Sequence, residues 1–464
     1  MTAIHDPYNA PDWVSGFVAG GGPRYLQIVK FLETAIATGS LRPGDRLPAQ
    51  RQLADALGID LTTVTRGFTE ARRRQLIEAR GTLGTFIAAP KVELTQSVDL
   101  SMNIPPPPDG VEMETLLRQG MSQVLMRTNI DLLMTYHLGG GSRADRDAGA
   151  QWLTPMLGRV DRERVVATPG AQAALAALIL ATTQPGDVIL MEPLGYPGLP
   201  MAAEQLGRRI ETVAVDADGM RPDALDDACR RFDARLIYLN PTLQNPTTST
   251  MPAQRRAAIV ETAARCNVKI VEDDPYWLFP ADAPPPLARL MPSQVYYLST
   301  LSKCLSPGLR TAFLVAPDGE RADAFLAALR TFSLTSPLTT ALVTQWINDG
   351  SAAQLLAGVQ AESRVRQRMA TGTLSGATRA AASEGIHVWH TLPSYWRAQD
   401  LSAAARAEGL VVTPSTAFHT GANPPNAIRI SLGGCPSRGQ LDAALRKLSN
   451  LLAQKPALAR EMVI

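Results

Sequence analysis

A lysine follows a short apolar run in the segment VYYLSTLSKCLSPGLR, with hydroxyl side chains beside it. The run is typical of a strand, and its end would deliver Thr300, Ser302 and Lys303 together. Arg310 follows after a Pro-Gly turn. A deprotonated lysine amine condenses with an aldehyde, and hydroxyls with a guanidinium suit a phosphate dianion through charge-assisted hydrogen bonds. The segment therefore predicts a site for an aldehyde that carries a phosphate.

Two further segments place polar side chains after strand-like runs. In KIVEDDPYWLF, Asp273 ends the run, where a carboxylate can keep a pyridine nitrogen protonated and make the ring an electron sink. Tyr276 lies three residues later, within reach of a cofactor oxygen or phosphate. In LIYLNPTLQNPTTS, Asn245 lies between prolines and is suited to donate to a ring hydroxyl. Ligands of open α/β sheets bind at the carboxyl ends of strands, so we expect these residues at one edge.

Two more segments add to the predicted site. In ATPGAQAALAALIL, a strand and a turn at Gly170 open a long helix. The free backbone N–H groups of Ala171 and Gln172, together with the helix dipole, form an anion site. Tyr196, in MEPLGYPGLP, is placed to stack on a cofactor ring. Each segment alone is common, but together, in this order after strands, they are hard to explain without a cofactor.

Short apolar runs alternate with helical segments from about Val111 onward. This pattern indicates an α/β fold with a mostly parallel sheet covered on both faces. Shorter strand-like pieces and an amphipathic helix near Arg438–Gln454 indicate a smaller α+β subdomain at the C-terminal end. The expected strands of the main sheet are Arg164–Ala167, Asp187–Met191, Leu236–Leu239, Lys269–Val271, Val295–Leu298 and Thr311–Val315.

The N-terminal part has the pattern of a helix-turn-helix followed by a hairpin. A first helix in PRYLQIVKFLETAIATG ends at Gly39, and the next, AQRQLADAL, stops at Gly58. Asp60 caps a third helix from about Thr62 to Gln75. Two short β-prone pieces in IEARGTLGTFI then form a wing.

Charge and side chains indicate that this part binds DNA. Between Arg24 and Lys91 there are 11 Lys and Arg against 6 Asp and Glu, whereas the whole chain carries only +2. A basic segment on a near-neutral body favours an anionic partner, nucleic acid first. A recognition helix meets base edges and phosphates near its start, and here that start carries Thr62, Thr63, Thr65 and Arg66.

The motifs LRPGDRLP, RQLA, TTV and GTF, between Pro23 and Ile87, resemble the winged helix-turn-helix of GntR-type regulators. Leu61 departs from the pattern, since many relatives have a polar or basic residue there, and this argues against base-specific readout from that position. The resemblance implies DNA contacts by Arg51, Thr62, Thr63, Thr65 and Gly81.

The order of the later motifs resembles fold-type-I aminotransferases, specifically the aminotransferase-like domain of MocR regulators within the GntR group, from about Asp99 onward. The resemblance implies pyridoxal 5′-phosphate as cofactor, with Lys303 bound to its aldehyde and Asp273 at its ring nitrogen; with Tyr276 these form the catalytic set. It also implies Asn245 and Tyr276 at the ring hydroxyl and Tyr196 stacked on the ring. The phosphate would be held by Ala171, Gln172, Thr300, Ser302 and Arg310.

The predicted ligand side of the pocket is where the chain departs most from the family. In AIRISLGG, Arg429 matches the arginine that takes the carboxylate of an amino-acid ligand, the alternative being a structural ion pair. NPTTS replaces the usual NPTG, Thr311 stands where relatives often have glycine, and YHLGGGSRADRDAGAQWL lacks the family's glycine, proline and Leu-Arg pattern. Tyr136 and His137 are candidates to line this side, or else packing residues.

These patterns predict three parts. A winged helix-turn-helix domain covers 20–88, and a proline-rich linker covers 89–110, because Pro105–Pro108 forbid helix and favour an extended spacer. An aminotransferase-like domain covers 111–464, with its small subdomain at about 335–464.

Composition and motifs limit the expected compartment of the protein and the metals it could bind. No signal peptide is visible at the N-terminus, and the longest apolar run falls far short of the roughly 20 residues that span a bilayer. Four isolated cysteines (Cys229, Cys266, Cys304, Cys435) lack metal-binding spacing. We therefore expect reduced thiols, no metal site and a cytoplasmic protein.

The leading interpretation is a homodimeric, pyridoxal phosphate-dependent transcription regulator that binds an operator in double-stranded DNA. It would sense the cofactor, an amino compound, or both. One alternative is a working aminotransferase with an accessory DNA-binding domain. Another is a sensor of the cofactor alone, which needs the same pocket but not Arg429.

Overall fold

The computed structural model describes residues 14, 17, 21–74, 76–88, 99–320, 322–374, 378–379 and 384–455. The chain divides into two compact units, Met1–Gln96 and Ser97–Ile464. No helix in the described ranges is long and apolar enough to cross a membrane.

The first unit has the expected helices and hairpin. Gly58, in the left-handed region with φ of 62°, ends the second helix, and the Asp60 carboxylate caps the third by accepting a 2.8 Å hydrogen bond from the Thr63 N–H. Apolar residues four apart on two helices, Ile28 with Leu32 and Val64 with Phe68, are fully buried in its core. The elements are α1 (Arg24–Ala37), α2 (Gln50–Leu57), α3 (Leu61–Arg73), β1 (Ile77–Ala79) and β2 (Thr85–Ile87).

The second unit is built on a seven-stranded sheet with the order β3-β11-β10-β9-β8-β4-β5. Strand β11 is antiparallel to both neighbours, and the other pairs are parallel. All six expected strands are confirmed, while the edge strand β5 escaped prediction because its residues are only half-buried or exposed. The strands are β3 (Val165–Thr168), β4 (Val188–Met191), β5 (Arg209–Thr212), β8 (Leu236–Leu239), β9 (Lys269–Asp273), β10 (Val295–Thr300) and β11 (Ala312–Val315), and a two-stranded ribbon adds β6 (Val215–Asp216) and β7 (Gly219–Met220).

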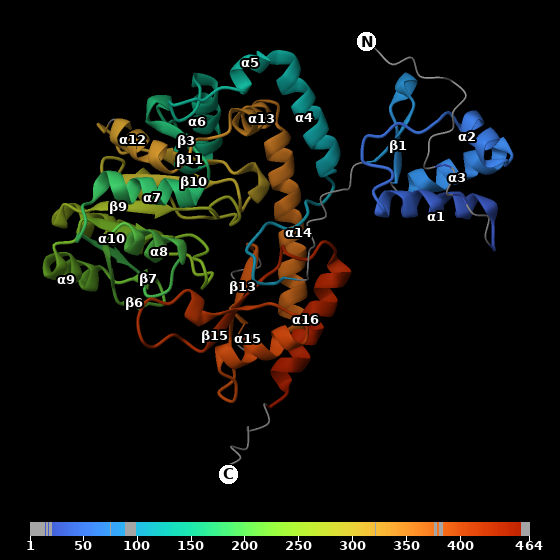
Figure 1. Ribbon diagram of the computed structural model, residues 1–464. Coiled ribbons are helices and arrows are strands. Elements are labelled where there is room, and N and C mark those ends of the chain that lie inside the picture. Colours follow the sequence, from blue (N-terminus) through green and yellow to red (C-terminus); the bar gives the residue numbers. More distant parts are fainter. Residues whose placement is uncertain are drawn as a thin grey trace. The chain divides into compact units, whose positions relative to one another are not determined.

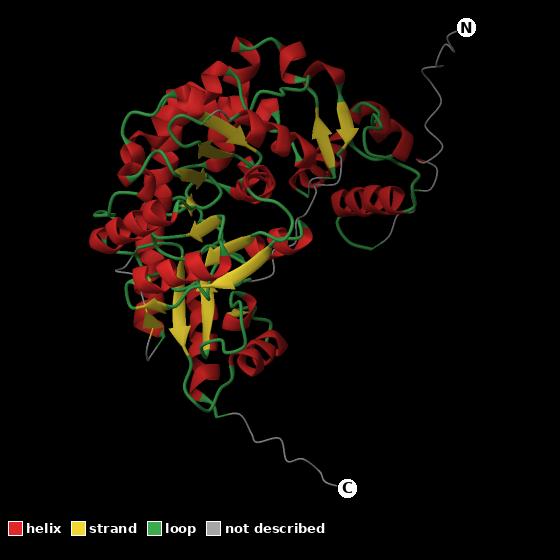
Figure 2. Cartoon of the chain, turned by 90° about the vertical axis from the view of Figure 1, so that its left-hand side faces the viewer, coloured by secondary structure: helices red, strands yellow, loops and turns green. Residues whose placement is uncertain are grey.

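Helices cover both faces of this sheet (Figures 1 and 2). Alternate residues of β4 show why: Val188 and Leu190 are buried in one core, and Ile189 and Met191 in the other. The first core is closed by α4 (Met113–Arg127), α5 (Ile130–Leu133), α6 (Arg143–Leu157), α9 (Pro222–Phe232), α10 (Ala253–Cys266), α11 (Leu287–Leu290) and α13 (Pro337–Asn348). The second is closed by α7 (Ala171–Thr182), α8 (Gly198–Gln205) and α12 (Asp323–Phe332).

A small subdomain with its own antiparallel sheet, of order β12-β13-β15-β14, follows the large one. Helix α14 runs from the large subdomain along the small one (Figure 1). The start expected near residue 335 is corrected, because α13 packs in the core of the large sheet through Leu342 and Trp346. The elements are α14 (Ser351–Thr373), β12 (Thr378–Arg379), β13 (His387–Thr391), α15 (Ala398–Ala407), β14 (Thr413–Pro414), β15 (Ala427–Ser431) and α16 (Arg438–Ala453).

The segment expected as a linker, 89–110, is only partly described, since 89–98 lie outside the described residues. Its described part does not act as a free spacer. Asp99 pairs with Val411 at the small sheet, and Leu100 is fully buried in the small subdomain's core. These residues therefore belong to the second unit, because an apolar side chain and backbone hydrogen bonds fix them before the proline run begins.

Candidate functional site

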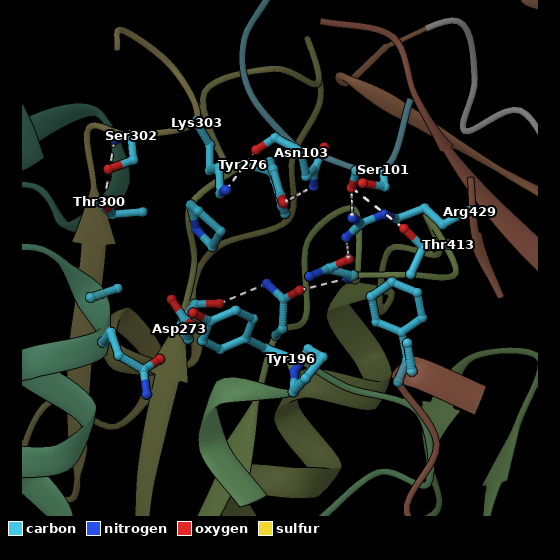
Figure 3. Close-up of a pocket in the computed structure, with 18 of the residues that line it drawn as sticks. Ser101, Asn103, Tyr196, Asp273, Tyr276, Thr300, Ser302, Lys303, Thr413 and Arg429 are labelled. Atoms are coloured by element: carbon cyan, nitrogen blue, oxygen red, sulfur yellow. Dashed lines mark hydrogen bonds between the residues drawn. The ribbon is translucent and has the colours of Figure 1, made fainter. Parts of the chain in front are cut away.

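A cavity of about 390 Å³ lies at the carboxyl ends of β8, β9 and β10 (Figure 3). It is placed where ligands bind in open α/β sheets. Every residue that the sequence analysis assigned to the cofactor or to an amino-acid carboxylate lines it: Ala171, Gln172, Tyr196, Asn245, Asp273, Tyr276, Thr300, Ser302, Lys303, Arg310 and Arg429.

Lys303 follows β10 and extends its amine into the cavity (Figure 3). Its Nζ donates a 2.6 Å hydrogen bond to the main-chain carbonyl of Asn103. Burial, followed by the positive charges of Arg429 and Arg310, lowers the pKa of the Lys303 amine to about 8, although Asp273 opposes the shift. A larger fraction of this amine is therefore neutral and nucleophilic near neutral pH than for an ordinary lysine.

Asp273, the last residue of β9, presents one free carboxylate oxygen. Its Oδ2 accepts a 2.7 Å hydrogen bond from the Tyr238 hydroxyl on β8, while Oδ1 is buried with no partner among the described residues. Burial raises the pKa of Asp273 to about 6, against the lowering effects of Tyr238 and Lys303. Asn240 fixes the same backbone by donating to the Asp273 carbonyl at 2.7 Å. The free oxygen suits a protonated ring nitrogen.

Another part of the cavity wall supplies hydrogen-bond donors for an anion. Thr300 and Ser302 supply hydroxyls, and the first backbone N–H groups of α7 lack intrahelical partners. Arg310 lies against the start of α7, so a side-chain carbon at Gly170 would come within 2.9 Å of its Nη2. Only glycine fits there, with φ of 97°. Arg310 has no ion pair in the described part of the chain, which leaves its charge for a ligand.

Arg429, on β15, closes the cavity from the small subdomain. It donates 2.7 Å and 2.5 Å hydrogen bonds to Asn245 Oδ1 and the Ser101 carbonyl, and its guanidinium carbon lies 4.6 Å from the centre of the Phe418 ring. Burial lowers its pKa to about 10. Its Nε has no partner among the described residues. None of their carboxylates lies within ion-pairing distance of it, although the charge of Asp99 opposes the lowering of its pKa. The side chain therefore suits a ligand carboxylate.

The structure adds residues that the sequence analysis missed. The Asn103 amide donates a 2.7 Å hydrogen bond to the Tyr276 hydroxyl, and burial raises the pKa of Tyr276. Ser101 and Asn103 lie in the segment expected as a linker, where the only signal was the alternation of apolar and polar residues before the prolines. The other lining residues that were missed are Pro197, Asn240, Pro275, Thr413, Ala417 and Phe418.

Tyr136 and His137 do not line this cavity in the single chain. Tyr136 is 88% exposed, and a His137 ring nitrogen hydrogen-bonds the Leu132 carbonyl at 2.9 Å.

The predicted DNA-contacting side chains lie on the surface of the first unit, with Thr63 half-buried. Thr63 donates to the Asp60 carboxylate at 2.6 Å, and Thr62 also donates to it. Thr65 donates to Gln50 Oε1 at 2.8 Å. These hydroxyls must therefore exchange partners before they donate to a phosphate.

The predicted arginine and wing contacts are free of such competition. Arg51 is exposed on α2, and the Arg66 guanidinium lies 4.8 Å from the centre of the Tyr25 ring, with no ion pair to either arginine among the described residues. Gly81 is exposed at the turn of the hairpin with φ of 55°. The arginines are therefore the contacts best supported by the geometry.

Two family models match the chain: aminotransferase class I and II over residues 117–448, and the bacterial regulatory proteins of the gntR family over residues 24–87. The chain belongs to the aminotransferase class I and II family. Its order of domains, a GntR helix-turn-helix before an aminotransferase domain, is the MocR-type architecture. The cofactor of this fold is pyridoxal 5′-phosphate.

Relatives of this MocR-type protein share the whole arrangement. The HTH-type transcriptional regulator YdeF of Bacillus subtilis is 28% identical, covering 93% of this chain and 94% of its own. The HTH-type transcriptional regulator TauR of Rhodobacter capsulatus is 27% identical, with 87% and 92% covered. The crystal structure of an archaeal alanine:glyoxylate aminotransferase matches 78% of this chain and 91% of its own, with a TM-score of 0.70 and 27% identity.

The residues of the cavity fit pyridoxal 5′-phosphate. The unpartnered Asp273 oxygen matches a ring nitrogen, the amine of Lys303 matches an aldehyde, and the donors near Arg310 match a phosphate. The Asp273 Oδ1 is buried without a partner, Arg310 has no ion pair among the described residues, and the Lys303 amine hydrogen-bonds a neutral carbonyl and no carboxylate there. This is the state expected of groups that a cofactor completes.

Proposed function

We propose that the protein is a transcription regulator whose aminotransferase-like domain senses pyridoxal 5′-phosphate together with an amino compound. The observation that carries this proposal is the combination, in one chain, of a winged helix-turn-helix with a cavity that holds the Lys303 amine and the Arg429 guanidinium. The regulators YdeF and TauR, which match nearly the whole chain, support the DNA-binding half.

When bound, the cofactor supplies an aldehyde and an electron-withdrawing ring. Lys303 Nζ would be the group that bonds the aldehyde, and Asp273 Oδ1 would accept a hydrogen bond from the protonated ring nitrogen. Asn245 uses Oδ1 for Arg429, so its amide N–H₂ remains to donate to the ring hydroxyl. Tyr276 would contact the same oxygen, and Tyr196 would cover the ring face. The residues that would hold the phosphate are Ala171, Gln172, Thr300, Ser302 and Arg310.

Arg429 takes the carboxylate of an amino compound. In the described residues the buried Arg429 guanidinium has no close ion pair, and Asp99 acts on it only at longer range. Such burial is costly unless the charge is paired, and sensing of the cofactor alone would leave it without a close partner. An amino compound that brings its own carboxylate completes the pair. This is why we favour an amino compound over the cofactor as the signal.

A working aminotransferase is the second candidate. The observation that favours it is the pKa of Lys303, about 8, which lets this amine accept and return a proton near neutral pH. The archaeal alanine:glyoxylate aminotransferase, similar over most of the second unit, supports the same view. In this case the DNA-binding domain would be accessory.

A homodimer is part of the proposal. Eight large apolar side chains between residues 117 and 138 are exposed on and after α4, and an exposed patch of this kind marks an interaction surface. A second copy of the chain would cover them, and two winged domains would then read two half-sites or repeats of an operator, in the cytoplasm. The eight are Leu117, Leu125, Met126, Ile130, Leu132, Met134, Tyr136 and Leu138.

Two assays on the purified protein separate these functions. The first measures the imine absorption band of the bound cofactor, which Lys303→Ala should abolish, and the shift of DNA from upstream of the protein's own gene. The second measures transamination with common amino acids. We expect DNA binding that changes with an amino compound. Turnover at ordinary enzymatic rates without DNA binding would reverse the ranking, and absence of cofactor absorption at saturation would refute both functions.

A further inference from the structure

The chain that leaves the first unit forms part of the wall of the cofactor cavity. After residues 89–98, Leu100 is buried and its carbonyl accepts a 2.7 Å hydrogen bond from the Ser431 N–H. Gly433 and Gly434 allow this close approach, because a side-chain carbon at either would overlap the carbonyls of Ile104 or Asp99. The next residues, Ser101 and Asn103, line the cavity.

Asn103 contacts two functional groups with two different atoms. Its main-chain carbonyl accepts the 2.6 Å hydrogen bond from Lys303, and its amide donates the 2.7 Å hydrogen bond to the Tyr276 hydroxyl (Figure 3). The residue is only 7% exposed. His387 lies behind the pair, with Nδ1 3.4 Å from the Asn103 amide nitrogen and its ring 5.6 Å from that of Tyr276.

The hydrogen bond from the Asn103 amide to Tyr276 determines where the Tyr276 hydroxyl can donate its own proton. A phenol oxygen that accepts one hydrogen bond keeps its own O–H to donate elsewhere. Because Asn103 donates to Tyr276, the tyrosine proton is left for a group in the cavity. Burial lowers the pKa of His387 to about 3, so its ring is neutral and adds no charge here.

The main-chain contact depends on whether the lysine amine is free. When neutral Lys303 Nζ bonds to an aldehyde carbon, both amine hydrogens leave with the carbonyl oxygen as water. In its neutral form the bonded nitrogen carries no hydrogen, so the Asn103 carbonyl loses its donor, and a buried carbonyl without a partner is unfavourable. A phosphorylated ligand without an aldehyde leaves the amine, and so the hydrogen bond, in place.

We propose that Asn103 couples the state of Lys303 to the chain that leads to the DNA-binding unit. Its carbonyl holds segment 99–104 against the free amine and releases it when the amine is consumed, while its amide positions the Tyr276 hydroxyl. Asn103 is a positioning residue, and this role rests on the proposed cofactor sensing.

Hydrogen–deuterium exchange of the full-length protein tests the main-chain contact. Pyridoxal 5′-phosphate, which consumes the amine, is compared at saturation with pyridoxamine 5′-phosphate, which has no aldehyde. We expect the peptide covering 99–104 to exchange at least about twofold faster with the first ligand, whereas peptides in α10 exchange equally with both. In Lys303→Ala, which has no amine to consume, the difference between the ligands should disappear.

Two substitutions test the side-chain contact through the pH dependence of the bound cofactor's visible absorption. Asn103→Asp would present a carboxylate that draws the Tyr276 proton away from the cofactor, whereas Asn103→Ala removes the donor only. We expect Asn103→Asp to shift the midpoint pH more than Asn103→Ala, with Tyr276→Phe abolishing the difference.

The outcomes distinguish the role of Asn103 from cofactor sensing itself. Equal exchange of 99–104 with both bound ligands, or equal midpoints in the Asp and Ala variants, overturns the role of Asn103 and leaves cofactor sensing intact. Failure of either ligand to bind, measured by fluorescence titration, overturns both.

Discussion

The Tyr238 hydroxyl donates a 2.7 Å hydrogen bond to one carboxylate oxygen of Asp273 and leaves the other oxygen facing the cavity. The two residues lie on adjacent parallel strands, β8 and β9. This bond both orients the carboxylate and favours its ionised form.

We therefore expect Tyr238→Phe to weaken cofactor binding about tenfold at pH 7, since a hydrogen bond to a charged group contributes about 1.5–3 kcal/mol. Loss of the bond raises the pKa of Asp273 further, so less carboxylate is available for the ring nitrogen. Tyr297→Phe is the matched control, because its hydroxyl contacts Asp274 at 3.5 Å and not Asp273. Spectroscopic titration measures both, and equal losses would remove Tyr238 from this role.

Asp273→Asn should stabilise the cofactor-free protein while abolishing tight cofactor binding. The folded-state pKa of Asp273, about 6, lies above its usual 3.8, so its contribution to stability is present below pH 3.8 and is lost as pH rises through 6. At pH 8 the variant escapes this cost, and we expect its Tm to rise by a few degrees. Below pH 4 the advantage should vanish. Thermal unfolding at both pH values is the measurement, and a lower Tm at pH 8 would contradict it.

Cofactor capture should accelerate with pH up to about 8 and then level off, because the pKa of Lys303 lies there. Arg429→Gln removes one of the charges that lower this pKa, so the midpoint should move upward by a measurable fraction of a pH unit. Arg330→Gln, a substitution at an exposed arginine on α12 that hydrogen-bonds Leu138, is the control. Stopped-flow absorbance across pH 6–10 follows the rate. An unchanged midpoint pH in Arg429→Gln would show that the charge of Arg429 does not affect the pKa of the Lys303 amine.

Arg310 and Arg429 should affect different ligands. Arg310→Gln removes a phosphate partner and should weaken the binding of pyridoxamine 5′-phosphate at least about tenfold, as expected for the loss of a charge-assisted bidentate contact. Arg429→Gln should change the affinity for that ligand by less than about threefold. It should weaken the binding of N-(5′-phosphopyridoxyl)-L-alanine, which adds a carboxylate, about tenfold or more. Calorimetric titration of both ligands on both variants tests this. Parallel losses for the two ligands would assign Arg429 to the cofactor instead.

In the first unit, Arg51→Ala and Arg66→Ala should each weaken operator binding and lower the slope of log K against log salt by about one. Neither arginine has an ion pair in the described residues, so each charge is available to a phosphate. Arg446→Ala, on α16 and paired with Asp442 at 2.8 Å, is the control of equal charge. Fluorescence anisotropy at several salt concentrations gives the slope. An unchanged slope in Arg51→Ala and Arg66→Ala would show that these two arginines do not contact DNA phosphates.

The sequence predicted the strands and the polar residues after them because both depend on local patterns. Asp273 ends one apolar strand and Lys303 follows another by three residues, and the parallel topology brings the ends of these strands to one edge. Arg310 reaches the same edge because it lies just before the antiparallel strand β11. Tyr238 could not be found this way, because it lies inside a buried strand and acts across to the neighbouring one.

Asn103 escaped prediction for a different reason. The prolines that follow it indicated a spacer, yet the residues before them are fixed by contacts with Ser431, Gly433 and Gly434, more than three hundred positions later. No local pattern reports a partner at that separation. For the same reason the boundary near residue 335 was placed too early, since the burial of α13 depends on helices far away in the sequence.

The antiparallel strand β11 returns directly beside β10, so the loop that carries Lys303 and Arg310 is anchored at both ends in one sheet. The residue proposed to bind the aldehyde and the arginine proposed to bind the phosphate therefore lie on one loop whose two ends are fixed in the same sheet. Arg429 stands on the other subdomain. A rocking of that subdomain would move Arg429 relative to this loop, while Lys303 and Arg310 keep their spacing. The affinity for a ligand's carboxylate could then change without any change in the distance between the aldehyde-binding amine and the phosphate-binding guanidinium.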